Sequence, residues 1–171
     1  NIFQAIQPSL LLSSYIKQYW YLELRNIERI SQRIVPTGNC GIYFLLRGKE
    51  MYSPTDRGLL PASYVYGQSS VPADIVFSGT VRLVAVIFQS IGAMAFFRMP
   101  MDELKEQKIM IDSLDDPDMI ELEKRLMDCS EAMDCVSLIE TFLINRLYGF
   151  DAVNYKRLDT AMQLIDSGQY D

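Results

Sequence analysis

Hydrophobic and polar residues follow two different patterns along the chain, and the pattern changes near Ser90. Before that point, short runs of β-branched and aromatic residues alternate with Gly, Pro, Asn and Asp, which is typical of strands joined by turns. Several short strands at this spacing predict an antiparallel sandwich or barrel. The predicted strands are 19–24, 31–35, 41–46, 63–66, 74–77 and 81–88, with turns at 36–39, 47–49, 53–56 and 78–79 and a possible short helix at 8–16.

After Ser90, apolar residues recur every three or four positions, which indicates helices. Residues 92–98 predict a short helix that ends before Pro100. Asp116 followed by Pro117 predicts a helix N-cap with proline in the first turn. Further helices are expected over 136–147, closed by Gly149, and from about 155 to 165. The predicted fold class is therefore α+β, an antiparallel β-barrel or sandwich followed by an α-helical segment.

Composition narrows the class of protein. The chain has 171 residues, of which 49% are hydrophobic and 22% charged, as in one soluble, well-cored domain with a helical appendage. Its net charge is −6, with 16 basic and 22 acidic residues. Because DNA binding depends on basic residues that neutralise phosphates, the chain is not expected to bind DNA by itself. The apolar runs are shorter than a membrane helix and no secretory signal pattern opens the chain. We expect a cytoplasmic protein.

The chain contains no histidine, and this absence excludes several kinds of active site. Catalytic Ser-His-Asp and Cys-His arrangements and histidine-rich metal sites all need that residue. The sequence also lacks the glycine-rich loops that cradle phosphates. Cys40, Cys129 and Cys135 are widely spaced and are expected to be reduced thiols. We therefore predict no enzyme activity, no metal site and no cofactor.

Aromatic residues crowd the β half, and two interpretations remain open. They either fill the core, or they line a pocket where tyrosine hydroxyls and the indole N–H orient an apolar or aromatic effector. Strand alternation puts Tyr64 and Tyr66 on one face. Arg82, within an apolar run, is either a surface charge or an anchor for an anionic effector, and Gln68 either caps a turn or reaches a ligand. The candidate ligand-binding residues are Trp20, Tyr43, Tyr64, Tyr66, Gln68 and Arg82.

Apolar residues between 119 and 133 recur at intervals of 3, 4, 3 and 4, which is the spacing of a coiled coil, but over only about two heptads. Such a stripe either packs on the chain's own barrel or pairs two copies of the chain. The run 136–147 allows the same two interpretations. The candidate dimerisation residues are Met119, Leu122, Leu126, Met133, Ile139 and Leu143.

Six short stretches spread over nearly the whole chain form an ordered set of motifs. They are Pro8 with Tyr15-Ile16 and Tyr19-Trp20; Arg33-Ile34-Val35-Pro36 with Gly38 and Cys40; Tyr66-Gly67-Gln68; Phe88 with Gly92-Ala93, Phe97, Pro100-Met101 and Glu103-Leu104; 138–147; and Arg157-Leu158-Asp159 through Ile165. In this order they resemble the N-terminal region of AraC-type bacterial transcription regulators.

The resemblance implies a cupin-like β domain over 1–100, a helical dimerisation or linker segment over 101–150, and the start of a helix-turn-helix DNA-binding domain over 151–171. It implies that the chain senses an effector, dimerises, or both, as a homodimer that touches DNA only through a C-terminal domain beyond Asp171. Two alternatives remain: a free-standing small-molecule-binding cupin-like protein or enzyme, and a purely structural dimerisation domain.

Overall fold

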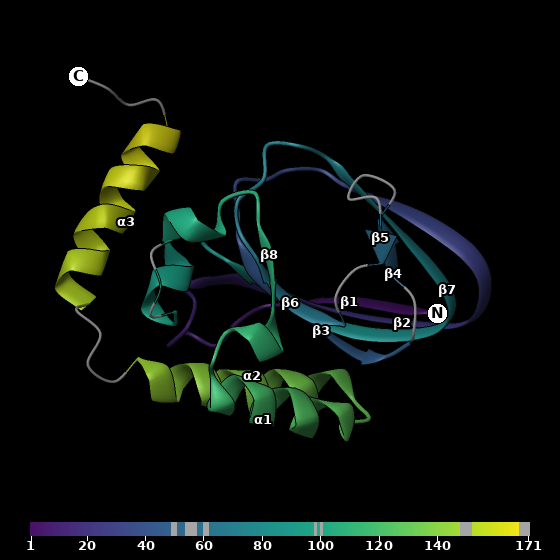
Figure 1. Cartoon of the computed structure of the whole chain (residues 1–171). Coiled ribbons are helices and arrows are strands. Elements are labelled where there is room, and N and C mark those ends of the chain that lie inside the picture. The colour runs from purple at the N-terminus through teal and green to yellow at the C-terminus, as the bar shows by residue number, and fades with distance from the viewer. Residues whose placement is uncertain are drawn as a thin grey trace.

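The structure, a computed structural model, describes residues 1–48, 51–53, 58–59, 62–97, 99, 101–147 and 152–167. In this part of the chain an antiparallel sheet precedes three α-helices, so the predicted α+β class is confirmed (Figure 1). The strands are β1 (Ile2–Ile6), β2 (Ile16–Ile34), β3 (Gly41–Arg47), β4 (Met51–Ser53), β5 (Gly58–Leu59), β6 (Ser63–Tyr66), β7 (Ala73–Phe88) and β8 (Lys108–Met110). The α-helices are α1 (Pro117–Met127), α2 (Ala132–Arg146) and α3 (Ala152–Asp166), and short 3₁₀ helices are η1 (Gly92–Ala95), η2 (Met101–Leu104) and η3 (Ile111–Ser113).

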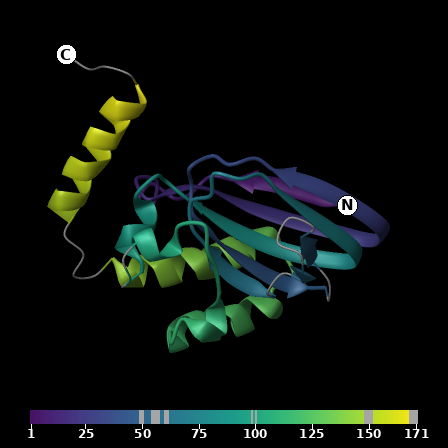
Figure 2. The same ribbon diagram turned by 45° about the horizontal axis from the view of Figure 1, so that its top comes forward.

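The sheet is open rather than a closed barrel. Its strand order is β1-β2-β7-β3-β6-β8, and the small strands β4 and β5 extend from β7. Within the described residues, the two end strands β1 and β8 are not paired with each other, although closure of a barrel requires such pairing. Of the predicted barrel or sandwich, the described residues therefore form an open antiparallel sheet and not a closed barrel. Figures 1 and 2 show instead a sheet that curls along the long strands β2 and β7.

Two pairs of predicted strands are each one continuous strand. Residues 19–24 and 31–35 belong to β2, and 74–77 and 81–88 belong to β7, while β2 and β7 pair along their length with bulges near Ile27. Gly79 (φ +74°) and Asn26 (φ +52°) take the left-handed conformation within this region. The predicted turn at 78–79 is therefore a β-bulge within the strand pair. Gly79 adopts the left-handed conformation there, but the chain does not reverse direction.

Two predicted short helices have other conformations. The segment before β2 consists of turns, in which Leu12 N donates to Ser9 O and Ile16 N donates to Leu12 O. The expected helix over 92–98 is the 3₁₀ helix η1, and its expected end at Pro100 lies outside the described residues. Gly92 packs so closely on the carbonyl of Tyr15 that a Cβ would overlap it, and this contact explains the glycine.

The helical part begins as predicted and then departs from prediction. The Asp116 side chain accepts from Met119 N at 3.1 Å and Pro117 is in the first turn, which confirms the predicted N-cap. However, α1 ends at Met127 and α2 starts at Ala132, so Met119 and Met133 lie on different helices. The prediction of one apolar stripe along a single helix over 119–133 is therefore wrong. The turn between α1 and α2 keeps the spacing of three and four residues, so the spacing alone does not reveal the break.

The sheet has an apolar core on each face. Helices α1 and α2 cover one face, where Tyr19, Phe44 and Val86 of the sheet pack with Leu126 and Ile139 of the helices. A second apolar cluster, centred on β3, β6 and β7, occupies the opposite face. The strand β8 and the 3₁₀ helices η2 and η3 lie within 101–150, before the helix whose start Asp116 and Pro117 predicted. None of the helices in the described ranges has the length and hydropathy needed to span a bilayer.

Candidate functional site

Four of the aromatic residues predicted to bind a ligand lie together on the sheet face opposite α1 and α2. Trp20 of β2 is paired with Ala85 of β7, Ala85 with Tyr43 of β3, and Tyr43 with Tyr64 of β6. Residues directly opposite each other on neighbouring strands share a face, so these side chains form one row across four strands. Tyr66, two residues beyond Tyr64, lies on the same face, as strand alternation predicted. We call Trp20, Tyr43, Tyr64 and Tyr66 the aromatic cluster.

The three tyrosines of the aromatic cluster pack on one another. The rings of Tyr43 and Tyr64 are stacked with centroids 5.3 Å apart, and Tyr66 lies 5.4 Å from Tyr43. The Tyr66 phenol occupies the space above Gly41, where a Cβ would overlap it. Tyr43 and Tyr64 are 8% and 1% exposed, whereas Trp20 and Tyr66 are half-buried. The cluster is therefore packed at its centre and reaches solvent at its two ends.

Burial sets the protonation of these phenols. It raises the pKa of Tyr43 to about 12, and it raises the pKa of Tyr66 well above the usual value of a tyrosine, with a further increase from the neighbouring Tyr43. Removing water from an ionisable group disfavours its charged form. Near neutral pH both groups are therefore uncharged hydroxyls, which can donate and accept hydrogen bonds.

The other two candidate ligand residues lie elsewhere. Arg82 is on the helix-covered face, because it alternates with Val81 and Leu83 of the second core, and its Nη2 donates to Met127 O at 3.0 Å. It neutralises the carbonyl end of α1, where a cation is favourable. It is thus neither a plain surface charge nor part of the aromatic cluster. Gln68 is exposed after β6 and its backbone carbonyl accepts from Glu106 N.

The predicted dimerisation residues mostly pack inside the chain. Met119, Leu122, Leu126, Ile139 and Leu143 are all below 5% exposed and belong to the core between the helices and the sheet. Met133 differs, since 57% of its surface is exposed on α2. Of the six side chains, only that of Met133 is exposed enough for a second copy to contact it. Dimerisation through the other five stays an untested prediction, because the structure leaves these side chains no exposed surface.

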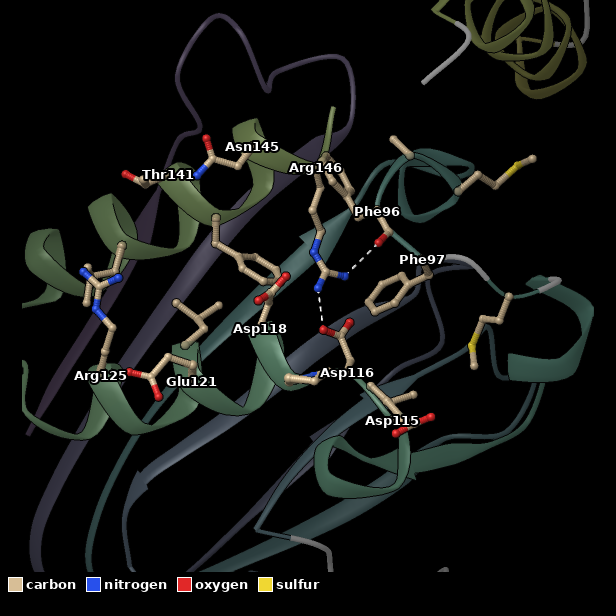
Figure 3. A pocket seen from close by; sticks show the side chains of 18 residues that line it. Phe96, Phe97, Asp115, Asp116, Asp118, Glu121, Arg125, Thr141, Asn145 and Arg146 are labelled. Atoms are coloured by element: carbon tan, nitrogen blue, oxygen red, sulfur yellow. Dashed lines mark hydrogen bonds and ion pairs between the residues drawn. The ribbon is translucent and has the colours of Figure 1, made fainter. Parts of the chain in front are cut away.

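A groove of about 1000 Å³ lies between α1, α2 and η1 (Figure 3). Phe96 and Phe97 follow η1 at one side, Leu122 comes from α1, and Leu138 and Phe142 come from α2. Polar side chains line its edges. Those on the α1 side are Asp115, Asp116, Asp118, Glu121 and Arg125, and those on α2 are Thr141, Asn145 and Arg146.

An ion pair bridges the groove from α1 to α2. Arg146 Nη2 lies 2.6 Å from Asp116 Oδ1, and Arg146 Nη1 donates to Phe96 O at 3.1 Å (Figure 3). The guanidinium also lies 4.2 Å from the ring centroid of Phe142, in a cation–π contact. Burial raises the pKa of Asp116, but the hydrogen bonds from Arg146 and Met119 and the Arg146 charge outweigh this and lower it. One arginine thus holds α1, α2 and η1 together.

The remaining charges make the groove edge acidic. Asp115, Asp118 and Glu121 are exposed, and Arg125 is the cation that faces them after Asp116 and Arg146 have neutralised each other. Sequence reasoning did not find this groove. Its local signal was the Asp116-Pro117 helix start, but the pairing with Arg146, thirty residues later, follows only from how α1 packs on α2.

The cysteines are reduced in the structure. Cys40 and Cys135 are buried and Cys129 is half-buried, and Cys129 Sγ donates to Arg125 O at 3.6 Å. Within the described residues, no three acidic or cysteine side chains gather closely enough to hold a metal ion.

Comparison with known proteins places the sheet in a family. No curated protein and no solved structure matches the chain. A family described as a domain of unknown function, DUF6597, matches residues 4–110, which include all the strands from β2 to β8 and most of β1. Because this match covers more than half of the 171 residues, the chain belongs to the DUF6597 family.

Proposed function

We propose that this chain is the effector-sensing and dimerisation part of an AraC-type bacterial transcription regulator, acting in the cytoplasm. The observation that carries the proposal is the aromatic cluster, in which the sheet gathers Trp20, Tyr43, Tyr64 and Tyr66 on the face that α1 and α2 do not cover. The curled, cupin-like sheet would hold the effector. A C-terminal domain beyond Asp171 would contact DNA, because the acidic chain is poorly suited to binding phosphates.

The chemistry of the cluster favours a small, flat and uncharged effector. Aromatic rings bind such molecules by stacking, and a few hydroxyls fix their orientation. The hydroxyls of Tyr43 and Tyr66 are neutral near pH 7. Arg82, the cation that would have suited an anion, lies on the opposite face. Trp20, which is half-buried at the end of the row, offers the point of entry.

The chain's single tryptophan provides the test. Phenol, indole and benzamide, with benzoate as a charged counterpart, should be titrated while Trp20 emission and the melting temperature are followed. We expect a saturable change with at least one uncharged compound. Tyr66→Phe should weaken it about tenfold, the value of one hydrogen bond of about 1.4 kcal/mol. Tyr21→Phe, on the helix-covered face, is the matched control.

Absence of any saturable response, for all four compounds, would contradict effector sensing at this cluster. The close stacking of Tyr43 on Tyr64 favours a second candidate, a purely structural dimerisation domain with a filled interior. That candidate predicts a dimer that ignores all four compounds. The third candidate, a free-standing binding protein or enzyme, predicts a reading frame that stops soon after Asp171.

A further inference from the structure

The strand β1 is an open edge of the sheet. It pairs with β2 along all five of its residues, and no other strand among the described residues pairs with its outer side. The backbone N–H and C=O groups of an edge strand can pair with another strand. Ile2 is 43% exposed and Phe3 is 62% exposed, so large apolar side chains accompany this unpaired backbone.

The strand at the other end of the sheet is protected in ways that β1 is not. The strand β8 has only three residues, and one of them is Lys108. Short length and lysine are two common means by which proteins keep an edge strand from pairing. In contrast, β1 has five residues, none of which is charged, proline or glycine. Of these two end strands, β1 is therefore the one suited to pairing.

We propose that β1 pairs with β1 of a second copy of this chain, antiparallel and about a two-fold axis at Gln4, so that two sheets become one. The inference rests on the proposed dimerising function. An uncharged strand suits this partner, because a two-fold axis brings each strand against its own copy, and charges near the axis would then repel one another. The core position of five of the six predicted dimerisation residues also requires a pairing surface elsewhere.

This axis determines which residues face each other. With Gln4 opposite the partner's Gln4, Phe3 faces the partner's Ala5, and all five residues of each β1 are paired. Phe3 and Ala5 share the face of Trp20, and the rings of Phe3 and Trp20 lie 6.2 Å apart in an edge-to-face contact. Aromatic side chains reach diagonal neighbours on a facing strand, so the two Phe3 rings can meet across the axis. The aromatic clusters of both copies then lie on one continuous face.

Met133 adds apolar surface on the helix side of the same edge. It lies seven residues before Glu140, two turns away on nearly the same side of α2. Glu140 accepts from Ser9 N at 2.8 Å and from Tyr19 Oη at 3.3 Å, so this side of α2 faces the segment that follows β1. Met133 is 57% exposed, and Ile2, on the helix side of β1, is also exposed. The exposed member of the predicted dimerisation residues is thus on the β1 side of α2.

A lysine substitution tests the pairing. Sedimentation velocity of the 171-residue chain should show a reversible dimer at concentrations up to about 200 μM, since a single strand pair is a small interface. Phe3→Lys should weaken the dimer about tenfold or more, because two like charges then meet beside the axis. Leu10→Lys is the matched control, because Leu10 is 94% exposed but lies outside β1. It carries the same added charge and should dimerise as the wild type does.

A cysteine at the axis tests the register. In a Cys129→Ser background, which removes the half-buried thiol, Gln4→Cys should form a disulfide-linked dimer when oxidised with copper phenanthroline. Facing residues of an antiparallel pair have Cα atoms about 4.5–5.5 Å apart, within the range of a disulfide. Ile2→Cys is the control, because the two copies of Ile2 are then four residues out of register, or about 13 Å apart. It should form little linked dimer.

The outcomes separate the pairing from the function on which it rests. A wild-type dimer that Phe3→Lys does not weaken overturns pairing through β1 but leaves dimerisation standing. Failure of Gln4→Cys to link, or stronger linking of Ile2→Cys, overturns the two-fold pairing at Gln4. A wild type that stays monomeric overturns both pairing and dimerisation, while the Trp20 titration still decides effector sensing.

Two further results are also decisive. Assemblies that keep growing with concentration overturn the two-fold pair, because that pair uses the β1 edge of both copies. Circular dichroism shows whether Phe3→Lys is folded. If it is not, the comparison of Gln4→Cys with Ile2→Cys decides alone.

Discussion

Asp116 and Arg146 are joined by a 2.6 Å ion pair that links the first residue before α1 to the last turn of α2. The same carboxylate caps α1 by accepting from Met119 N, and the same guanidinium reaches the backbone of Phe96 and the ring of Phe142. Both side chains are only 20% exposed. The pair is therefore shielded from solvent more than a surface ion pair and acts together with the cap.

Replacing Asp116 should loosen the helical part of the molecule. Asp116→Ala removes the N-cap, worth about 1 kcal/mol, and leaves a partly buried Arg146 without its counter-ion. We expect the free energy of unfolding to fall by about 2 kcal/mol in urea titrations. Asp118→Ala is the control, since Asp118 is exposed and does not cap α1, and it should change stability by less than about 0.5 kcal/mol. Equal losses in the two variants would contradict this role for Asp116.

The aromatic cluster should weaken the fold at high pH. The pKa of Tyr43 is raised from 10.0 to about 12, so folding favours the neutral phenol. The contribution of this neutral phenol to the free energy of unfolding is fully present below pH 10. It is lost as the pH rises from 10 to 12, by about 2–3 kcal/mol in total. Tyr43→Phe cannot ionise and should show a flatter decline of stability over this range.

Chemical unfolding at pH 8, 10 and 11 measures this difference directly. Tyr52→Phe is a suitable control because Tyr52 is 40% exposed. If wild type and Tyr43→Phe lose stability in parallel above pH 10, the buried environment of Tyr43 is not as described.

The three thiols should react at different rates. Burial raises the pKa of Cys40 to about 11, and burial together with the adjacent Cys129 raises that of Cys135 to about 12. Since the thiolate is the reactive form, both should resist Ellman's reagent at pH 7.5. Cys129 is half-buried and should account for the one fast-reacting thiol of the native protein.

Cys129→Ser should abolish that fast phase, whereas Cys40→Ser should leave it unchanged. All three thiols should react once the chain is unfolded in urea. A fast phase that survives in Cys129→Ser would show that one of the buried thiols is open to solvent.

Gly67 should tolerate no side chain. A Cβ at this position would overlap the backbone carbonyl of Leu104, which packs on the strand end next to the aromatic cluster. Backbone cannot move aside as a flexible side chain can, so Gly67→Ala should destabilise the fold by about 1–3 kcal/mol. Gly58 has no neighbour within 4 Å of its would-be Cβ among the residues that the structure describes, and Gly58→Ala is the matched control in thermal unfolding. Similar melting temperatures for both variants would contradict the contact.

Local signals in the sequence predicted local structure well. The strand 63–66 matches β6, and Asp116-Pro117 starts α1 because a cap depends only on residues in one turn. Strand alternation correctly put Tyr64 and Tyr66 on one face. Near Gly79 the sequence predicts a turn where the structure has a bulge. Glycine is compatible with both, and only the pairing with β2 decides between a turn and a bulge.

Features that depend on contacts between distant parts of the chain could not be predicted from the sequence. Trp20 joins Tyr43 only through the register of β2 and β3 on β7, which no local pattern fixes. The position of Arg82 required knowing which face the helices cover. Likewise, Arg146 meets Asp116 because α2 packs back along α1, and the open sheet reflects short end strands rather than any motif.

Strand β7 carries both cores of the molecule in alternation. Val84 and Val86 pack toward α1 and α2, while Ala85 and Ile87 pack toward the aromatic cluster. A strand has no slack between adjacent residues, since each step is only about 3.3 Å long. A molecule that displaced Ala85 from the aromatic cluster would therefore also move Val84 and Val86, on which α1 and α2 pack. The two faces of the sheet thus share β7, so a displacement of this strand on one face would also change the packing on the other face.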